Sequence, residues 1–152
     1  MKRKKNKPAK NATGKKLTEK AGLAIKHEFY LEASWILSAM FERKLKKLLI
    51  QVEKQNPGRG FTLEQLIKRV KYLHVLSRYK AMTAHFSVQL FDEIRIWKNQ
   101  RNEILKDIPD LHVSPARIER LALEGVKLYK EFNAACKSFK LPEEVSEHEN
   151  SA

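Results

Sequence analysis

Hydrophobic residues along this chain recur at steps of three and four, the spacing that places them on one face of an α-helix. The first such segment runs from about residue 23 to residue 52, and it carries two neighbouring apolar stripes. The sequence NPGRG at 56–60 then ends it, because proline and glycine interrupt helical structure. We therefore expect one long helix whose broad apolar face needs more than one partner helix.

A second helix begins with a well-defined capping sequence. Thr62 is a favourable N-cap residue, and Gln65 follows three residues later, which is the pattern of a capping box. Apolar residues continue at helical spacing as far as Leu76. The next segment, SRYKAMTAH at 77–85, predicts only a connection or a short extra turn.

Two further helices complete the pattern. The third begins near Ser87 and is ended by IPDLHVSP at 108–115. The fourth begins with Ser114 as its N-cap and proline in its first turn, a favourable combination. Gly125 lies in the apolar stripe of this last helix, where we expect it to let a neighbouring helix approach closely.

Four amphipathic helices with short connections predict an all-α fold. We expect a mostly antiparallel bundle of four to five helices. Five apolar residues of the third and fourth helices share the helical spacing and are predicted to be buried: Trp97, Ile104, Leu121, Leu128 and Phe132.

Charge divides the chain into three parts. Residues 1–26 hold ten Lys or Arg and one acidic residue, residues 27–140 hold 21 basic and 13 acidic residues, and residues 141–152 hold four Glu. The three sums of +9, +8 and −4 give the net charge of +13. We expect residues 1–22 to be a disordered basic arm, residues 23–140 to be the helical domain, and the acidic tail to be disordered.

The basic arm predicts a polyanionic partner. Clustered Lys and Arg side chains release counterions from phosphates, which favours nucleic-acid binding. The expected contacts come from Lys2, Arg3, Lys4, Lys5 and Lys7. A solvated arm without a partner is the alternative, and the two are compatible. A membrane-surface role is disfavoured, because the arm has no apolar face to insert.

Composition argues against several classes of protein. Cys136 is the only cysteine, so it forms no internal disulfide, and the five His are scattered, so we expect neither a metal site nor a cofactor. No run approaches the roughly 18 apolar residues of a membrane span. No hydrophobic segment directly follows the basic N-terminus, which argues against a secretory signal. We expect a cytoplasmic protein.

An arginine interrupts the apolar stripe of the third helix. Steps of three and four from Leu90 lead to Ile94, Trp97, Arg101 and Ile104. A side chain at such a position either buries its methylene groups and keeps its charged head in water, or is enclosed and needs a carboxylate or carbonyl partner.

If Arg101 is enclosed, Glu32 and Glu42 of the first helix are the candidate partners. Asn102 is adjacent in sequence and turned roughly 100° away around the helix. Arg95 and Lys98 are expected on the outer faces.

Three segments resemble HEPN proteins, the higher eukaryotes and prokaryotes nucleotide-binding family. They are YLEASWILSAMFERKLKKLL, FTLEQLIKRVKYL and IRIWKNQRNEILKDI, and the resemblance extends from Phe29 to Phe139. It implies a small helical bundle that usually dimerises and, in many members, is an RNase. The family signature is an arginine, usually a polar residue next, and a histidine a few residues later on the third long helix. The paired signatures meet at the dimer interface.

Arg101 and Asn102 match the first half of that signature, but Lys106 stands where the histidine is expected. The next histidine, His112, lies beyond the expected end of the helix. Histidine transfers protons near neutral pH because its unperturbed pKa is about 6.5, whereas that of lysine is about 10.4. The resemblance therefore implies that Arg101 and Lys106 bind nucleic acid without catalysing its cleavage.

Two other Arg-to-His spacings occur, from Arg69 to His74 and from Arg78 to His85. Neither arginine is followed by a polar residue of the kind that the family uses, and neither lies in the tryptophan-containing helix. We interpret these histidines as ordinary helix or loop residues.

Three functions remain open from the sequence. The first is a HEPN-like, non-catalytic protein that binds RNA or another polyanion, or a protein partner, as a homodimer. The second is a metal-independent endoribonuclease of the toxin or phage-defence class, whose variant site would consist of Arg101, Asn102 and Lys106. The third is a scaffold that binds only protein.

Overall fold

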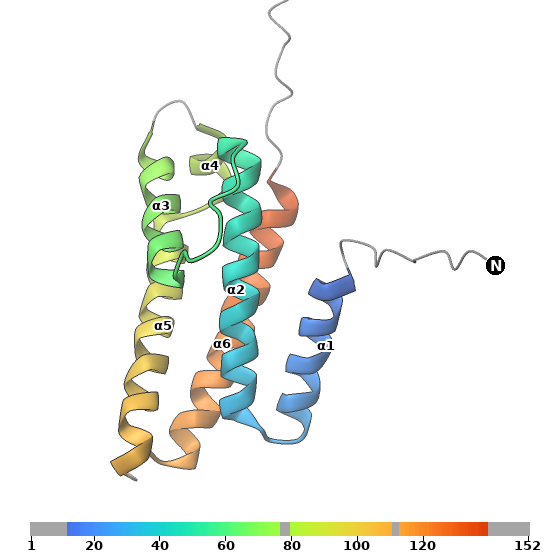
Figure 1. Ribbon diagram of the computed structural model, residues 1–152, viewed down its shortest axis with the longest axis vertical. Helices are drawn as coiled ribbons and strands as arrows, with labels where there is room; N and C mark the ends of the chain where they lie inside the picture. The colour runs from blue at the N-terminus through green and yellow to red at the C-terminus, as the bar shows by residue number, and fades with distance from the viewer. Residues whose placement is uncertain (1–11, 77–79, 111–112, 140–152) are drawn as a thin grey trace, which may run out of the picture.

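The computed structural model describes residues 12–76, 80–110 and 113–139, and these residues form helices without any strand (Figure 1). The helices are α1 (Ala12–Lys26), α2 (Tyr30–Glu53), α3 (Leu63–Val75), α4 (Lys80–His85), α5 (Val88–Asp107), the 3-10 helix η2 (Ile108–Asp110) and α6 (Pro115–Ser138). The predicted all-α fold is thus confirmed. Within these ranges, no helix is both long enough and apolar enough to cross a membrane.

Four helices, α2, α3, α5 and α6, form the bundle. Helix α2 packs against α3 and α6, and α5 packs against the same two helices, so α2 and α5 are diagonal to each other (Figure 1). Helix α1 packs on the outside of α2.

The expectation of a mostly antiparallel bundle needs correction. Helices α3 and α5 are antiparallel, since Lys71 pairs with Asp92 and Glu64 pairs with Lys98. Helices α2 and α6 are parallel. Near their starts the Tyr30 hydroxyl donates a hydrogen bond to Glu119, and at their ends the Gln51 side-chain amide donates one to the Phe139 carbonyl. The long loop after α2 returns along the bundle, so α3 runs in the direction of α2 (Figure 1). The bundle is therefore mixed.

The predicted first helix, from about residue 23 to residue 52, is two helices. Helix α1 ends in a reversal at Glu28, which adopts a φ of 60°. Two hydrogen bonds close this turn, from Phe29 N–H to the Ala24 carbonyl at 2.8 Å and from Glu28 N–H to the Ile25 carbonyl at 3.1 Å. This is the Schellman pattern, in which glycine usually occupies the left-handed position. Without that glycine, the sequence contained no signal for the break.

The boundary between arm and domain also moves. Residues 12–22, which were expected to belong to the disordered arm, are part of α1. Their attachment is hydrophobic, because Ala21 and Ala24 are buried and Leu17 packs against the core. The basic residues from Lys2 to Lys7 and the acidic tail at 141–152 lie outside the described residues.

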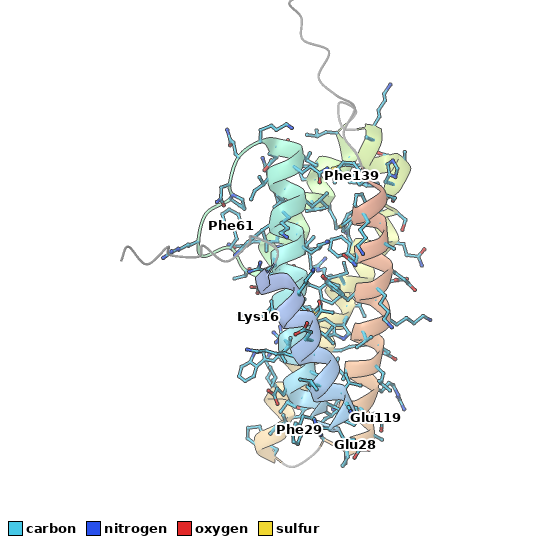
Figure 2. All side chains as sticks on the ribbon, turned by 90° about the vertical axis from the view of Figure 1, so that its right-hand side faces the viewer. Lys16, Glu28, Phe29, Phe61, Glu119 and Phe139 are labelled. Atoms are coloured by element: carbon cyan, nitrogen blue, oxygen red, sulfur yellow. The ribbon has the colours of Figure 1, made fainter. Side chains whose placement is uncertain are left out.

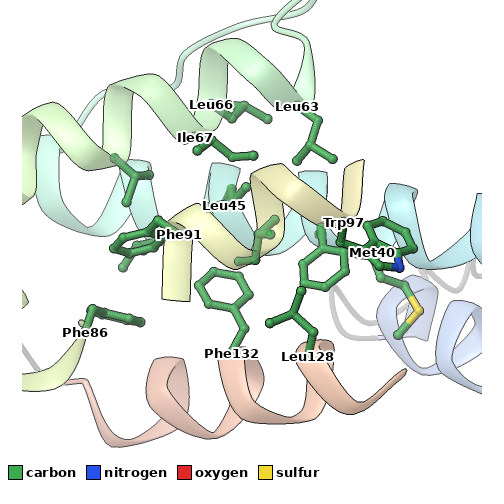
Figure 3. Packing of buried hydrophobic residues seen from close by; sticks show 14 of the residues in the cluster. Met40, Leu45, Leu63, Leu66, Ile67, Phe86, Phe91, Trp97, Leu128 and Phe132 are labelled. Atoms are coloured by element: carbon green, nitrogen blue, oxygen red, sulfur yellow. The ribbon is translucent and has the colours of Figure 1, made fainter. Parts of the chain in front are cut away.

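The hydrophobic core lies between the four long helices. Figure 3 shows side chains from α3, α5 and α6 that point toward one another. Phe41 of α2 joins them and contacts the ring of Trp97 at a centroid distance of 5.3 Å. All five residues predicted to be buried are buried: Trp97, Ile104, Leu121, Leu128 and Phe132.

Gly125 permits the contact between α5 and α6, as predicted. A Cβ atom on Gly125 would lie 2.8 Å from the ring of Trp97, closer than such atoms approach in proteins. The indole nitrogen of Trp97 also donates a hydrogen bond to the Leu121 carbonyl at 2.9 Å. The glycine and this bond together fix the position of Trp97.

The predicted helix starts are confirmed. Thr62 and Gln65 form a reciprocal capping box, with bonds of 2.9 and 3.2 Å. Ser87 and Ser114 cap α5 and α6 through their hydroxyl groups. The unassigned segment before Ser87 contains the short helix α4.

Candidate functional site

Helix α3 covers only part of α5. Glu64, in the first turn of α3, accepts from Lys98 and forms an ion pair with Arg95 at 3.2 Å. Since the two helices are antiparallel, the rest of α5 after Lys98 extends past the start of α3 (Figure 1). The expectation that Lys98 lies on an outer face was wrong: it is only 8% exposed, because Glu64 neutralises it inside the α3–α5 contact.

One side of α2 faces α3. Because α2 is the longer helix, this side extends past the start of α3. Glu53, near the C-terminal end of α2, binds Arg69 of α3 and so identifies this side. Alternating steps of four and three residues back from Glu53 lead to Glu42 and then to Trp35, so these residues share one side of α2. Trp35 is 65% exposed.

Helical spacing thus predicts that the corner which α3 fills at one end of the bundle is lined by other side chains at the opposite end, where Glu42 is near Arg101. Trp35 and Glu42 come from α2, and Arg101 and Asn102 come from α5. We name these four residues the open corner. Arg101 is placed there because it follows Lys98 by one helical turn on the side of α5 that meets α3.

The environment of Arg101 is intermediate between the two that the sequence allowed, a charged head in water and a fully enclosed side chain. Its side chain is half-buried, and burial lowers the pKa of Arg101 while the nearby carboxylate of Glu42 opposes that shift. Among the described residues, no acidic group forms an ion pair with it, so neither Glu32 nor Glu42 is a direct partner. The guanidinium remains charged, because arginine is not deprotonated in proteins.

The hydrogen bonds of Arg101 are incomplete. Its Nη2 donates to the Oδ1 atom of Asn102 at 3.4 Å. Its Nε is buried and has no hydrogen-bond partner within the described ranges. A buried polar atom without a partner is costly, by about 1–3 kcal/mol. An acceptor from another molecule could reach this enclosed donor only if the side chain moved, so the candidate for binding is the half-buried guanidinium as a whole.

The remaining member of the predicted site is on the surface. Lys106 is exposed in the last turn of α5, one turn after Asn102. The structure thus brings Arg101 and Asn102 into contact, and it leaves Lys106 nearby on the same helix as a solvated cation.

The described members of the two alternative Arg-to-His pairs, Arg69, His74 and His85, make structural contacts. The Nε2 atom of His74 lies 2.7 Å from the Phe86 carbonyl, so this ring joins α3 to the start of α5. Arg69 is engaged by Glu53. His85 stacks edge-on against Phe139. The other residues considered from the sequence lie outside the described ranges: Arg78, His112 and the arm residues Lys2, Arg3, Lys4, Lys5 and Lys7.

The described residues also contain neither an activated cysteine nor a metal site. Burial raises the pKa of Cys136 to about 12, so its thiol is protonated at neutral pH. No three His, Cys, Asp or Glu side chains come together within these ranges as metal binding would require.

Two features of this region were missed from the sequence. One is Trp35, which lies outside both apolar stripes of the first predicted helix; a tryptophan off the stripe was the available signal. The other is the ion pair of buried Lys98 with partly exposed Glu64, which depends on how α3 and α5 pack.

Comparisons with known proteins give no relationship. No family model matches the chain, and neither a curated protein nor a solved structure matches it.

Proposed function

We propose that this chain is a HEPN-like, non-catalytic protein that binds RNA or another polyanion as a homodimer. The observation that carries the proposal is the half-buried guanidinium of Arg101, whose Nε has no partner among the described residues. The resemblance in the α5 segment implies that this arginine belongs to a family signature.

The chemistry of the open corner fits a phosphate. A guanidinium offers parallel N–H donors that match two phosphate oxygens, and such charge-assisted bonds are short and strong. Asn102 adds an amide that both donates and accepts, and Lys106 adds a positive charge nearby. Glu42 limits the excess of positive charge, which favours a ligand held by directed hydrogen bonds.

The same residues argue against cleavage. Metal-independent hydrolysis of RNA needs a group that accepts and donates protons near pH 7. Arginine stays protonated and asparagine does not titrate, and none of Arg101, Asn102 and Lys106 is a histidine, the side chain whose unperturbed pKa suits this role. The corner therefore supports binding without turnover.

The exposed tryptophan supports dimerisation at this corner. Large aromatic residues are enriched at protein interfaces, where they bury much apolar area. In a two-fold dimer the same surface occurs on both subunits, so contacts through Trp35 would bring the two Arg101 side chains to one interface. That arrangement agrees with what the HEPN resemblance implies.

Incubation with labelled RNA in the presence of EDTA tests the proposal. Single-stranded and structured RNAs should shift to a bound form without cleavage above a buffer control. Arg101→Ala should weaken binding, whereas Arg120→Ala, at an exposed residue of α6, should leave it unchanged. Robust metal-independent cleavage that Arg101→Ala abolishes would instead assign the chain to the endoribonucleases.

A further inference from the structure

A groove lies on the side of the bundle away from α3, where α1 crosses α2 and α6. Figure 2 views this side, with α1 in front of α2 and α6 beside them. The groove has a volume of about 830 Å³. Its apolar lining comes from all three helices and includes Leu17, Leu37, Met40, Val126 and Tyr129.

The rest of the lining is strongly basic. Six basic residues and one acidic residue, Glu19, line the groove, which gives a net charge of +5. The basic residues are Lys15, Arg43, Lys44, Lys47, Lys130 and Lys137. None of the six forms an ion pair with a described residue. Burial lowers the pKa of Lys44, and the neighbouring charges of Lys47 and Lys137 lower it further.

Such a groove favours an amphipathic anion. Like charges that outnumber the nearby counter-charges repel one another, and an acidic ligand relieves that repulsion. The apolar side chains that line the groove would be covered by the apolar part of the same ligand.

We propose that the occupant is the acidic segment of this same chain, residues 141–152. Its sequence, LPEEVSEHENSA, contains four Glu and no Lys or Arg, so its charge of −4 complements the +5 of the groove. It also contains Leu141 and Val145 among the acidic residues, which supplies the apolar component. The segment begins three residues after the last residue of α6 and four residues after Lys137 in the groove wall.

The length of the segment is sufficient. From Lys137 to Leu123, which line the two ends of the α6 wall, fourteen residues of helix span about 21 Å at about 1.5 Å per residue. Twelve extended residues reach about 40 Å at about 3.3 Å per residue. The segment can therefore follow the whole groove while it remains attached to α6.

Attachment to the same chain makes even a weak contact effective. A short flexible connection produces an effective concentration on the order of millimolar, without any additional contact. The docked segment would neutralise the basic groove and exclude external anions from it. If the proposed polyanion binding also holds, the segment regulates how much of the basic surface is available, but the docking itself does not depend on that function.

A spin label on the segment tests the docking in the full chain. Ser151→Cys carries the nitroxide, and Cys136→Ala removes the native thiol. Amide resonances of the groove, such as those of Lys44 and Lys130, should be broadened, whereas those of Glu93 and Ile96 on the face away from α1 should not. The broadening should disappear at about 1 M salt, where the screening length is about 3 Å.

Charge variants identify the contacts. Replacing the four Glu of the segment with Gln should abolish the broadening, and it alters no described residue. Lys130→Glu should reduce it several-fold, whereas Lys127→Glu, one turn away on α6 and outside the groove lining, should not.

Three results would overturn the proposal. One is an absence of broadening, and another is broadening centred on the open corner. The third is broadening found only in mixtures of labelled and isotopically enriched chains, which would make a second copy the occupant.

As an independent measurement, the anionic dye anilinonaphthalene sulfonate should fluoresce several-fold more with the Glu-to-Gln chain than with wild type. Equal fluorescence would show that the groove is open in wild type.

Discussion

At the scale of the residue, Arg101 combines a binding chemistry with a structural disadvantage. Its guanidinium is half-buried and its Nε lacks a partner among the described residues. An apolar side chain of similar length avoids both penalties, and replacing buried charges by apolar residues is often neutral or stabilising. If Arg101 binds a polyanion as proposed, function and stability make opposite demands at this position.

Arg101→Met should consequently raise the free energy of unfolding by about 1 kcal/mol and weaken RNA binding at the same time. Urea denaturation and an RNA titration measure the two effects. Arg120→Met, at an exposed residue of α6, is the matched control and should change neither. Lower stability in Arg101→Met would mean that the guanidinium is fully satisfied in solution.

Gly125 offers a second prediction at this scale. Gly125→Ala should reduce the free energy of unfolding by about 1–3 kcal/mol, because the new methyl group overlaps the Trp97 ring, 2.8 Å away. Gly22→Ala is the matched control in α1, where an added Cβ meets nothing within 4 Å. It should be neutral or stabilising by up to about 1 kcal/mol through helix propensity. Equal effects of the two substitutions would contradict the close approach of α5 and α6.

At the scale of the element, the ion pairs of Glu64 hold the start of α3 against α5. Glu64→Gln should lower the free energy of unfolding by about 1–3 kcal/mol, because it leaves the buried ammonium group of Lys98 without a counter-charge. Glu103→Gln, at an exposed residue of α5, should have no effect. Chemical denaturation at neutral pH compares the two variants.

The pH dependence of this difference has a defined sign. The hydrogen bond from Lys98 is the main cause that lowers the pKa of Glu64 below its ordinary value of 4.5. The stabilising contribution of the carboxylate is therefore complete above that value and is lost as the pH falls through the folded-state pKa. The gap between wild type and Glu64→Gln should close in acid. A gap that widened in acid would contradict the ion pair.

The turn between α1 and α2 is also a property of the element. Glu28 occupies the left-handed position with a φ of 60°, which is strained for a residue with a side chain. Glu28→Gly should raise the free energy of unfolding by about 1 kcal/mol. Glu32→Gly, inside α2, should instead lower it by about 1 kcal/mol. Destabilisation by both substitutions would indicate that α1 and α2 form one continuous helix.

At the scale of the whole molecule, the open corner predicts a homodimer. Light scattering should give a dimer mass at tens of micromolar protein. Trp35→Glu should give a monomer, because a carboxylate in the centre of the contact cannot be paired. Tyr72→Glu, at another exposed aromatic residue on α3, should remain dimeric. A monomer mass for the wild-type chain would remove the dimer from the proposed function.

Local patterns in the sequence were sufficient for the fold class, the capped helix starts, the buried residues and the role of Gly125. Helical periodicity and capping depend on residues a few positions apart, so the sequence expresses them directly. The break at Glu28 could not be predicted from such patterns, because a residue with a side chain took the position that glycine usually marks. Arg101 was singled out because charge in an apolar stripe is also a local signal, and its role in binding stays a prediction.

Other features were decided only by tertiary structure. The direction of α3 depends on a loop that returns along the bundle, and loop paths carry no periodic signal. The burial of Lys98 depends on Glu64, 34 residues away, which becomes its neighbour only when α3 packs on α5. The incomplete bonding of Arg101 follows from the length of α3 relative to α5. Each is a relation between distant segments, and packing free energy summed over the whole bundle, which no short stretch of sequence contains, selects it.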